Sequence, residues 1–543
     1  MKSVPESLPE WESLTVPQQV AQMFVVRASG YLFDHQIQYP EWEPPRAKLQ
    51  HWIQDLGVGG VILLGGSAGE LALRSQQLQS FAKIPLLIAA DIEEGVGQRF
   101  SGAIWFPPPM AIGAIFRKDV ARALHYAQEM GAITASEALA IGINWVLSPV
   151  VDVNNNPLNP VINVRAFGET PEEVSQLASA FIQGAQRFPV LTTAKHFPGH
   201  GDTAVDSHLD LPVLPHSPAR LGEIELPPFA SAIASGVDAV MSAHLLIPAW
   251  DTERPATLSY PILTSLLRQE LGFEGLIVTD ALVMGAIANR YGASEAPVLA
   301  VEAGADILLM PVDPAGAIQA VCDAVTEGRI SEERIRASVE RIWKAKRKVQ
   351  GSRADLGDAP ISNPQSPIPN PLQLASPHAL NTSANISRDS LLVHGQVPLP
   401  RNTGNLRNLI VVDDVLNCKF LSKLAPAVAL PKSLGYQLQL VDPHTPTAPL
   451  SDAIAPISTT KTLLQLFIRG NPFRGSAGLT PVAEDLFKRL LKNAELQALV
   501  IYGSPYILEQ FLPHLPPEIP CVFSYGQMSE AQAIALEVLF PPQ

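Results

Sequence analysis

Eight short apolar runs constrain the fold of this chain more than any other feature. Segments of helical composition separate the runs, and near-continuous apolar runs of this length are typical of strands buried on both faces of a parallel sheet. We therefore expect an α/β fold in which eight β/α units close into a TIM barrel. An open doubly wound sheet is the alternative, but no GxGxxG fingerprint follows the first run. The runs are residues 22–26, 60–64, 85–91, 143–152, 190–196, 239–244, 275–280 and 306–311.

A stretch rich in Pro, Ser and Asn divides the chain. We expect residues 351–375 to form a linker, because this composition gives turns and extended backbone with little to bury. The barrel domain then occupies residues 1–350. Further apolar runs predict a smaller α/β layered domain over residues 376–543, which we expect to support the barrel or pack against it. These runs are residues 408–414, 464–470, 498–504 and 520–526.

The composition narrows the choice of partners. The 543 residues carry a formal charge of −14 and contain no run rich in Lys and Arg, which a nucleic-acid backbone or an anionic membrane surface would require. No segment reaches the roughly 18 uncharged apolar residues that cross a bilayer. The first residues lack the apolar core of a secretory signal, and the three cysteines are far apart. We expect a cytoplasmic protein without nucleic-acid or membrane partners.

Ionisable side chains stand where five of the predicted strands end. The carboxyl ends of barrel strands share one face, and the active sites of TIM barrels are built there. Any one of these residues alone could simply end an apolar run, but together they predict a polar site at that face. They are Asp91, Asp152, Lys195 with His196, His244 and Asp280.

The densest polar segment, KHFPGHGDTAVDSH, covers residues 195–208 and must be a loop, because its Pro and Gly residues prevent a regular helix. A metal site on His196, His200 and His208 is one hypothesis, although the helical spacing that suits paired histidine ligands is broken. A serine hydrolase would need a GxSxG elbow, which the sequence lacks. The third hypothesis is acid/base chemistry by His208, oriented by Asp206. A solvated loop without a chemical role is the remaining alternative.

The pattern resembles glycoside hydrolase family 3, and within it the β-N-acetylhexosaminidase branch. The loop is similar to the signature of that branch, KHFPGHG followed by DSH, and the resemblance covers residues 16–349. Several long motifs in sequence are a far more specific signal than a lone glycine pattern. The other matching blocks are DIEEGVGQRF (91–100), FPPPMAIGA (106–114), NVRAFGETP (163–171), MSAHLLIPAWD (241–251) and PATLSYPILTSLLRQELGFEGLIVTDALVMGAI (255–287).

The resemblance implies a TIM barrel and retaining hydrolysis of a terminal β-linked N-acetylglucosamine. It implies a small carbohydrate as the partner and neither a metal nor a cofactor. Asp280 becomes the nucleophile, and His208, assisted by Asp206, becomes the acid/base. The positions that it assigns to the sugar hydroxyls are Asp91, Arg99, Arg165, Lys195 and His196, for which ion pairing across the barrel mouth is the purely structural alternative.

One block departs from the branch. Where its members usually read DQEGG, this chain has Ile92 and then Glu93, Glu94 and Gly95, so a second carboxylate replaces a glycine. The usual following Arg is Val96. The mutual spacing of the Asp and Arg that flank this loop is unchanged, so we keep both in the predicted site.

The chemistry of glycoside cleavage suits these roles. Its oxocarbenium-like transition state needs an anionic nucleophile below the anomeric carbon and a proton donor at the leaving oxygen. Asp280, at a strand end of a rigid barrel, suits the first task. The His208 imidazole titrates near neutrality and gains from Asp206, so it replaces the usual second carboxyl group. Such a donor repels anions less than a carboxylate does, which makes phosphorolysis a further hypothesis.

Two other functions stay open. A β-glucosidase or β-xylosidase of the same family would take a catalytic Glu from the second domain and would not depend on His208. A non-catalytic sugar-binding protein would keep the pocket and lose turnover. For a cytoplasmic exo-acting enzyme of this branch we expect recycled peptidoglycan fragments as substrate, with chitooligosaccharides and glycoprotein sugars as alternatives.

Overall fold

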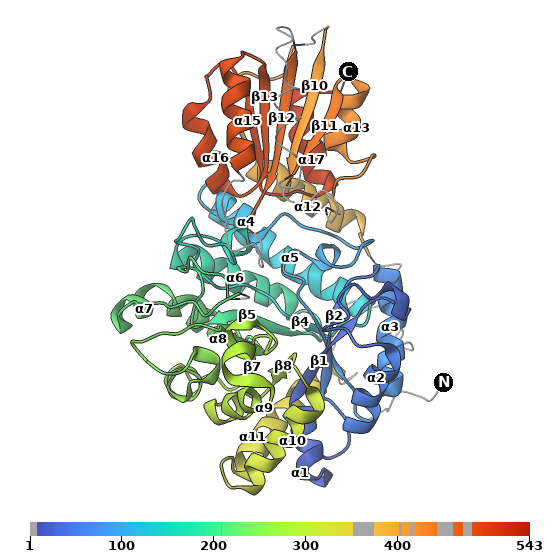
Figure 1. Cartoon of the computed structure of the whole chain (residues 1–543), viewed down its shortest axis with the longest axis vertical. Helices are drawn as coiled ribbons and strands as arrows, with labels where there is room; N and C mark the ends of the chain where they lie inside the picture. The colour runs from blue at the N-terminus through green and yellow to red at the C-terminus, as the bar shows by residue number, and fades with distance from the viewer. Residues whose placement is uncertain are drawn as a thin grey trace.

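The computed structural model describes residues 8–207, 209–350, 374–400, 404–412, 418, 420–442, 460–470 and 481–542. Over these residues the chain forms one sheet of eight strands and one of six. Figure 1 shows the two sheets toward opposite ends of an elongated molecule, with the barrel in blue to yellow and the second sheet in orange and red.

The first sheet is the predicted TIM barrel. Its strands pair in parallel in the order β7-β6-β5-β4-β3-β2-β1-β8, and a bridge between Val278 and Ile307 joins the two ends of this series. Each strand overlaps one of the eight predicted apolar runs, so the barrel prediction is confirmed. The strands are β1 (Phe24–Ser29), β2 (Gly60–Leu64), β3 (Leu87–Ala90), β4 (Trp145–Val146), β5 (Leu191–Phe197), β6 (Ala239–Ser242), β7 (Leu276–Thr279) and β8 (Leu308–Leu309).

Helices connect the barrel strands. Ordinary start signals set where they begin: Ser67 caps α3 in a reciprocal pair with Glu70, and Thr170 caps α6 just before a proline. The helices are α1 (Val16–Gln22), α2 (Arg46–His51), α3 (Ala68–Phe81), α4 (Pro109–Phe116), α5 (Val120–Ala140), α6 (Pro171–Ala185), α7 (Pro218–Ile224), α8 (Leu226–Ala234), the π-helix η7 (Pro261–Glu270), α9 (Gly285–Ala303), α10 (Pro314–Thr326) and α11 (Glu332–Gln350).

Helix α11 fastens the amino ends of the barrel strands. Its Lys346 is buried and donates hydrogen bonds to Gln22 Oε1 (2.9 Å), the Gly59 carbonyl (3.0 Å) and the Pro85 carbonyl (2.6 Å), just ahead of β1, β2 and β3. A second anchor is Asp306, ahead of β8, which accepts from the Ile277 amide of β7 at 3.0 Å. Three arginines also contact the Asp306 carboxylate, namely Arg268 at 2.6 Å, Arg341 at 3.2 Å and Arg334 at 3.5 Å.

The second sheet has the order β11-β10-β12-β13-β14-β9, with only the edge strand β9 antiparallel to its neighbour. The four predicted apolar runs form β10, β12, β13 and β14, whereas β9 and β11 are mostly exposed and so lack the apolar run that would predict them. The strands are β9 (Leu392–His394), β10 (Leu406–Val412), β11 (Gln437–Val441), β12 (Lys461–Ile468), β13 (Leu496–Gly503) and β14 (Cys521–Ser524). The helices are α12 (Pro377–Ser390), α13 (Pro426–Ser433), α15 (Pro481–Lys492), α16 (Pro505–Phe511) and α17 (Ser529–Leu539).

Polar contacts join the second domain to the barrel. Helix α12 lies between the second sheet and helices α4 and α5 (Figure 1), and its Asp389 accepts from Tyr126 Oη at 2.9 Å. Tyr506, at the start of α16, donates to Glu169 at 2.8 Å and accepts from Asn154 Nδ2 at 2.8 Å. Residues 351–373 of the predicted linker lie outside the described residues, so its boundaries stay a prediction.

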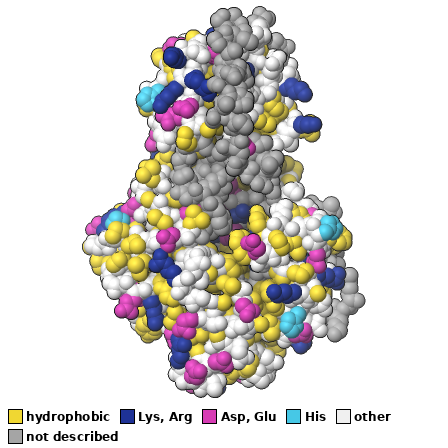
Figure 2. All heavy atoms as spheres, in the orientation of Figure 1, with side chains coloured by type: hydrophobic (Ala, Val, Ile, Leu, Met, Phe, Trp, Pro, Cys, Tyr) yellow, Lys and Arg dark blue, Asp and Glu magenta, His cyan; other side chains and the backbone are white. Residues whose placement is uncertain are grey.

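On the face drawn in Figure 2, Lys and Arg side chains are interspersed with Asp and Glu. In the part of the chain that the structure describes, no helix is both long and apolar enough to span a membrane.

Candidate active site

A cavity of about 580 Å³ lies at the carboxyl ends of the barrel strands and extends to the second domain. Its lining joins charged side chains of the barrel with aromatic residues of both domains. Two of the eight predicted site residues, Asp206 and His208, are not among its described lining residues. The other six all line it, and they are Asp91, Arg99, Arg165, Lys195, His196 and Asp280.

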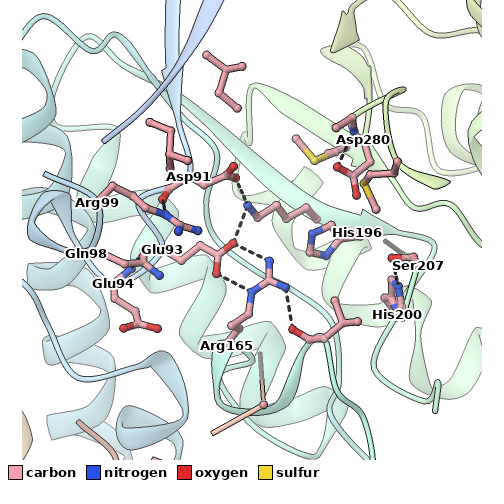
Figure 3. A pocket seen from close by; sticks show the side chains of 18 of the residues that line it. Asp91, Glu93, Glu94, Gln98, Arg99, Arg165, His196, His200, Ser207 and Asp280 are labelled. Atoms are coloured by element: carbon pink, nitrogen blue, oxygen red, sulfur yellow. Dashed lines mark hydrogen bonds and ion pairs between the residues drawn. The ribbon is translucent and has the colours of Figure 1, made fainter. Parts of the chain in front are cut away.

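The barrel strands themselves bring these side chains together. Asp91 follows β3 directly, Lys195 and His196 lie near the carboxyl end of β5, and Asp280 follows β7. Because parallel barrel strands end at one face, residues distant in sequence meet there. Figure 3 shows Asp91 and Arg99 on one side of the cavity and Asp280 on the other, with His196 between them.

A buried ion network forms one wall of the cavity. Lys195 Nζ lies 2.7 Å from Asp91 Oδ1 and 2.7 Å from Glu93 Oε1. Arg165 contacts both oxygens of Glu93, with Nε and Nη2 each at 2.8 Å. Burial alone would raise the pKa of Glu93, but the Arg165 and Lys195 charges hold it well below its usual value. Burial likewise opposes protonation of Lys195, yet Asp91 and Glu93 raise its pKa, so Lys195, Arg165 and Glu93 are ionised at neutral pH.

In this network Glu93 is sealed and Asp91 is accessible. The Glu93 side chain is 3% exposed and that of Asp91 is 36% exposed. Asp91 therefore keeps oxygen lone pairs for a ligand while Lys195 fixes its position. A carboxylate held in this way accepts hydrogen bonds from neighbouring sugar hydroxyls, and the guanidinium and ammonium groups donate to hydroxyl oxygens.

Asp152, at the end of the fourth predicted run, orients two histidines and does not line the cavity. It accepts from His196 Nδ1 at 2.8 Å and from the His200 amide at 2.7 Å. Burial opposes ionisation of Asp152, but the histidines and the amide donors lower its pKa. The His200 ring contacts the hydroxyls of Thr203 (2.8 Å) and Ser207 (3.0 Å), and burial lowers its pKa to about 4. His200 is therefore a neutral imidazole that holds the loop leading to residue 208.

Hydrogen bonds fix the backbone next to Asp280, the candidate nucleophile. Asp280 Oδ1 accepts from the Ala281 amide at 2.7 Å. His244, the strand-end histidine of β6, contacts the Ala281 carbonyl through Nε2 at 3.0 Å and Thr257 Oγ1 through Nδ1 at 2.8 Å. His244 is fully buried, so its place is behind the site.

The predicted acid/base pair is only half described. Asp206 is 2% exposed, and its carbonyl accepts from the amides of Leu209 and Asp210. His208 lies outside the described residues, so its role stays a prediction. In the described part of the chain, no group of three or more His, Cys, Asp and Glu side chains is placed to hold a metal ion.

Several cavity residues have no counterpart in the predicted site. Glu93 matches the Glu of the DQEGG motif and Glu94 departs from it, and their charge is the one signal in the sequence that marks them. Trp105 carries no motif of its own. From the second domain the structure adds Val412, Cys418, Phe420, Phe467, Arg469, Gly470 and Gln527, none of which a local pattern marks.

Two family models match the chain. The glycosyl hydrolase family 3 N-terminal domain matches residues 15–345, and the bacterial glycosyl hydrolase family 3 C-terminal domain matches residues 399–541. The first covers the barrel and every cavity residue contributed by it. The second covers the six-stranded sheet apart from its edge strand β9.

Individual relatives agree with these models. The chain is 35% identical over 403 residues to β-hexosaminidase A of Pseudoalteromonas piscicida, covering 68% of this chain and 65% of that relative. It is 37% identical over 263 residues to a β-hexosaminidase of Xylella fastidiosa strain M23, covering 48% of this chain and 78% of that one. A solved β-N-acetylglucosaminidase from Paenibacillus sp. FPU-7 superposes with a TM-score of 0.77 at 32% identity, covering 97% and 96% of the two chains.

Proposed function

Because this chain belongs to glycosyl hydrolase family 3, we propose that it is a retaining exo-β-N-acetylglucosaminidase that removes a terminal β-linked N-acetylglucosamine. The observation that carries the proposal is a single cavity in which Asp280 faces the set of Asp91, Arg165 and Lys195. The former supplies an anionic nucleophile, and the latter supplies matched hydrogen-bonding groups for a sugar. The similarity to β-hexosaminidases and to a solved β-N-acetylglucosaminidase supports the choice of sugar.

Catalysis proceeds through two displacements. The Asp280 carboxylate attacks the anomeric carbon and forms a glycosyl-aspartate, while His208 donates a proton to the departing glycosidic oxygen. A water molecule then gives a proton to His208 and attacks the anomeric carbon, which releases the sugar and restores Asp280. Asp206 stabilises the imidazolium form of His208, and His200 steadies the intervening Ser207.

The second domain bears on the choice between branches of the family. A β-glucosidase-type mechanism takes its acid/base carboxylate from that domain. The described residues of the second domain that line this cavity include an arginine and a glutamine but no Asp or Glu. The proposed mechanism gives this role to the Asp206 and His208 pair on the barrel loop.

A panel of nitrophenyl glycosides tests the proposal. We expect selective turnover of the N-acetyl-β-glucosaminide and little turnover of the glucoside or xyloside. His208→Ala should lower the rate by about 10²- to 10⁴-fold, the usual contribution of acid/base help. Glucosidase activity equal to or above the N-acetylglucosaminidase activity would refute the assignment. Adding phosphate and looking for the sugar 1-phosphate separates hydrolysis from phosphorolysis.

In the cell we propose peptidoglycan fragments as the substrate and the cytoplasm as the place of action. The exo mode of cleavage expected for the branch supports the choice of peptidoglycan fragments. Comparison of turnover on muropeptides, chitooligosaccharides and glycoprotein glycans tests the substrate. Fractionation of cells followed by detection of the protein tests the location.

A further inference from the structure

The second domain reaches the sugar-binding wall of the cavity through a single buried carboxylate. Glu94 is 1% exposed and belongs to the loop that follows β3. Arg469, which follows β12, places Nη2 2.6 Å from Glu94 Oε1 and Nη1 3.3 Å from Oε2. The indole N–H of Trp105 donates to Glu94 Oε2 at 2.8 Å. Glu94 thus holds one partner from each domain.

In the motif DQEGG, which residues 91–95 resemble, the position of Glu94 is a glycine. A glycine there offers no side chain to bind. In this chain the position carries a buried charge whose countercharge comes from about 375 residues further along the sequence. Truncating one partner of a buried pair is strongly destabilising, because it leaves the other charge unpaired. The two residues therefore depend on each other.

Aromatic rings continue the contact into the core of the second domain. Trp105 meets Phe420 edge-on at 6.5 Å between ring centroids, and Phe420 stacks on Phe467 at 5.4 Å. Phe467 stacks in turn on the buried Tyr502 at 4.3 Å. The Arg469 end of β12 is therefore held by a packed series of rings.

The loop that Glu94 anchors also carries two sugar-binding candidates. Its amide donates to Gln98 Oε1 at 3.1 Å, and its carbonyl accepts from the Phe106 amide at 2.8 Å. Next to these contacts, Arg99 Nε donates to the Asp91 carbonyl at 3.0 Å. In Figure 3, Glu94, Gln98 and Arg99 lie together on the side of the cavity away from Asp280.

We propose that Arg469 of the second domain is a positioning residue, which through Glu94 fixes the loop that presents Asp91 and Arg99 to the terminal sugar. The second domain is then part of the sugar-binding machinery. The side of the cavity that it holds lies away from Asp280, so Arg469 governs sugar affinity more than the bond-breaking step. This inference rests on the proposed function.

Arg469→Ala tests the proposal with two readouts. We expect the inhibition constant for free N-acetylglucosamine and the KM for its nitrophenyl glycoside to rise together by about tenfold, while kcat changes by less than threefold. Arg469→Lys keeps the charge and should recover part of the affinity. The matched control is Arg407→Ala, because Arg407 forms an equally buried pair with Glu495 (2.8 Å) in the same domain but does not line the cavity. This control should leave both constants within twofold of wild type.

A double-mutant cycle tests whether Arg469 acts through Glu94. We expect Glu94→Ala, Arg469→Ala and the double variant to show similar inhibition constants, since each breaks the same link. Independent, multiplying effects would overturn the proposal, as would an unchanged inhibition constant in a folded Arg469→Ala protein. A wild-type protein with no N-acetylglucosaminidase activity would instead refute the proposed function.

Discussion

The two ends of the barrel both bury ionisable side chains, but their partners differ. At the amino ends, Lys346 donates to two backbone carbonyls and a glutamine, and Asp306 accepts from a strand amide and from arginines that also bind the backbone. At the carboxyl ends, Asp91 and Glu93 are matched to Lys195 and Arg165, side chain to side chain. The first network is closed, whereas the second borders a cavity.

This difference explains why charge content alone does not identify a site in a barrel. Charged side chains that form hydrogen bonds with the backbone at the strand ends fix the strands relative to one another. Ion pairs between side chains at a cavity leave groups such as Asp91, which is 36% exposed, available to a ligand. We therefore expect substitutions at the amino ends to lower stability with little effect on activity, and substitutions of cavity-facing groups at the carboxyl ends to lower activity.

The largest expected effect is at Asp280, the proposed nucleophile. Asp280→Asn should lower turnover of the nitrophenyl N-acetylglucosaminide by at least about 10⁴-fold, because the amide cannot form the glycosyl intermediate. Its unfolding temperature should stay close to wild type, since the side chain faces a cavity. Steady-state kinetics and a thermal melt check both statements. Residual activity within about 100-fold of wild type would remove Asp280 from the mechanism.

The counterpart at the other end is Asp306→Ala. It leaves three arginines without their buried carboxylate, which should lower the free energy of unfolding by about 3–5 kcal/mol. At a temperature where the variant is folded, kcat/KM should stay within threefold of wild type. Urea denaturation and kinetics measure the two quantities. A stable variant with lost activity would contradict the division between the two ends.

Each end of the barrel buries a base, Lys346 at the amino ends and His200 at the carboxyl ends, whose titration should change the free energy of unfolding. Burial lowers the pKa of Lys346 from about 10.5 to about 7 and the pKa of His200 from about 6.5 to about 4. At a pH between the two pKa values of either residue, the unfolded chain binds a proton that the folded chain does not bind. As pH falls through each window, stability falls. Titration of His200 should therefore lower the free energy of unfolding by ~3 kcal/mol as the pH falls from 6.5 to 4. Urea titrations of wild type and His200→Gln at pH 7.5, 5.5 and 4.5 measure it, and the two proteins should converge in stability as pH falls. A pH-independent difference would contradict the assignment.

The smallest expected effect concerns hydrogen-bond geometry. Arg165→Lys keeps the charge but loses the two-point contact with Glu93, which should raise the inhibition constant for N-acetylglucosamine by about five- to tenfold. Arg268→Lys is the matched change at the amino ends, where we expect lower stability and an unchanged inhibition constant. Competitive inhibition assays and thermal melts on both variants check the pair. Equal inhibition constants for the two variants would contradict the distinction.

The fold was predictable because its signals are local. A buried parallel strand reads as an apolar run, and all eight barrel strands overlap such a run. The sequence did not predict the strands β9 and β11 because their residues are largely exposed. Their pairing depends on the neighbouring strand and not on their own composition.

The site was predictable where residues stand at strand ends and only partly elsewhere. The spacing of Asp91, Lys195 and Asp280 follows from the barrel itself. The contact between Glu94 and Arg469 joins residues far apart in the chain, and no periodicity or motif links them. Such pairs follow from the docking of two domains, which a single sequence does not encode locally.

The residues around the cavity range from Arg27 to Gln527 along the chain. During translation the ribosome releases the amino-terminal portion first, so Asp280 and the other barrel residues of the cavity emerge before the second-domain residues that complete its lining. The lining of the cavity is complete only after Gln527 has been synthesised. A prematurely terminated product can therefore carry an intact barrel and still be a poor enzyme.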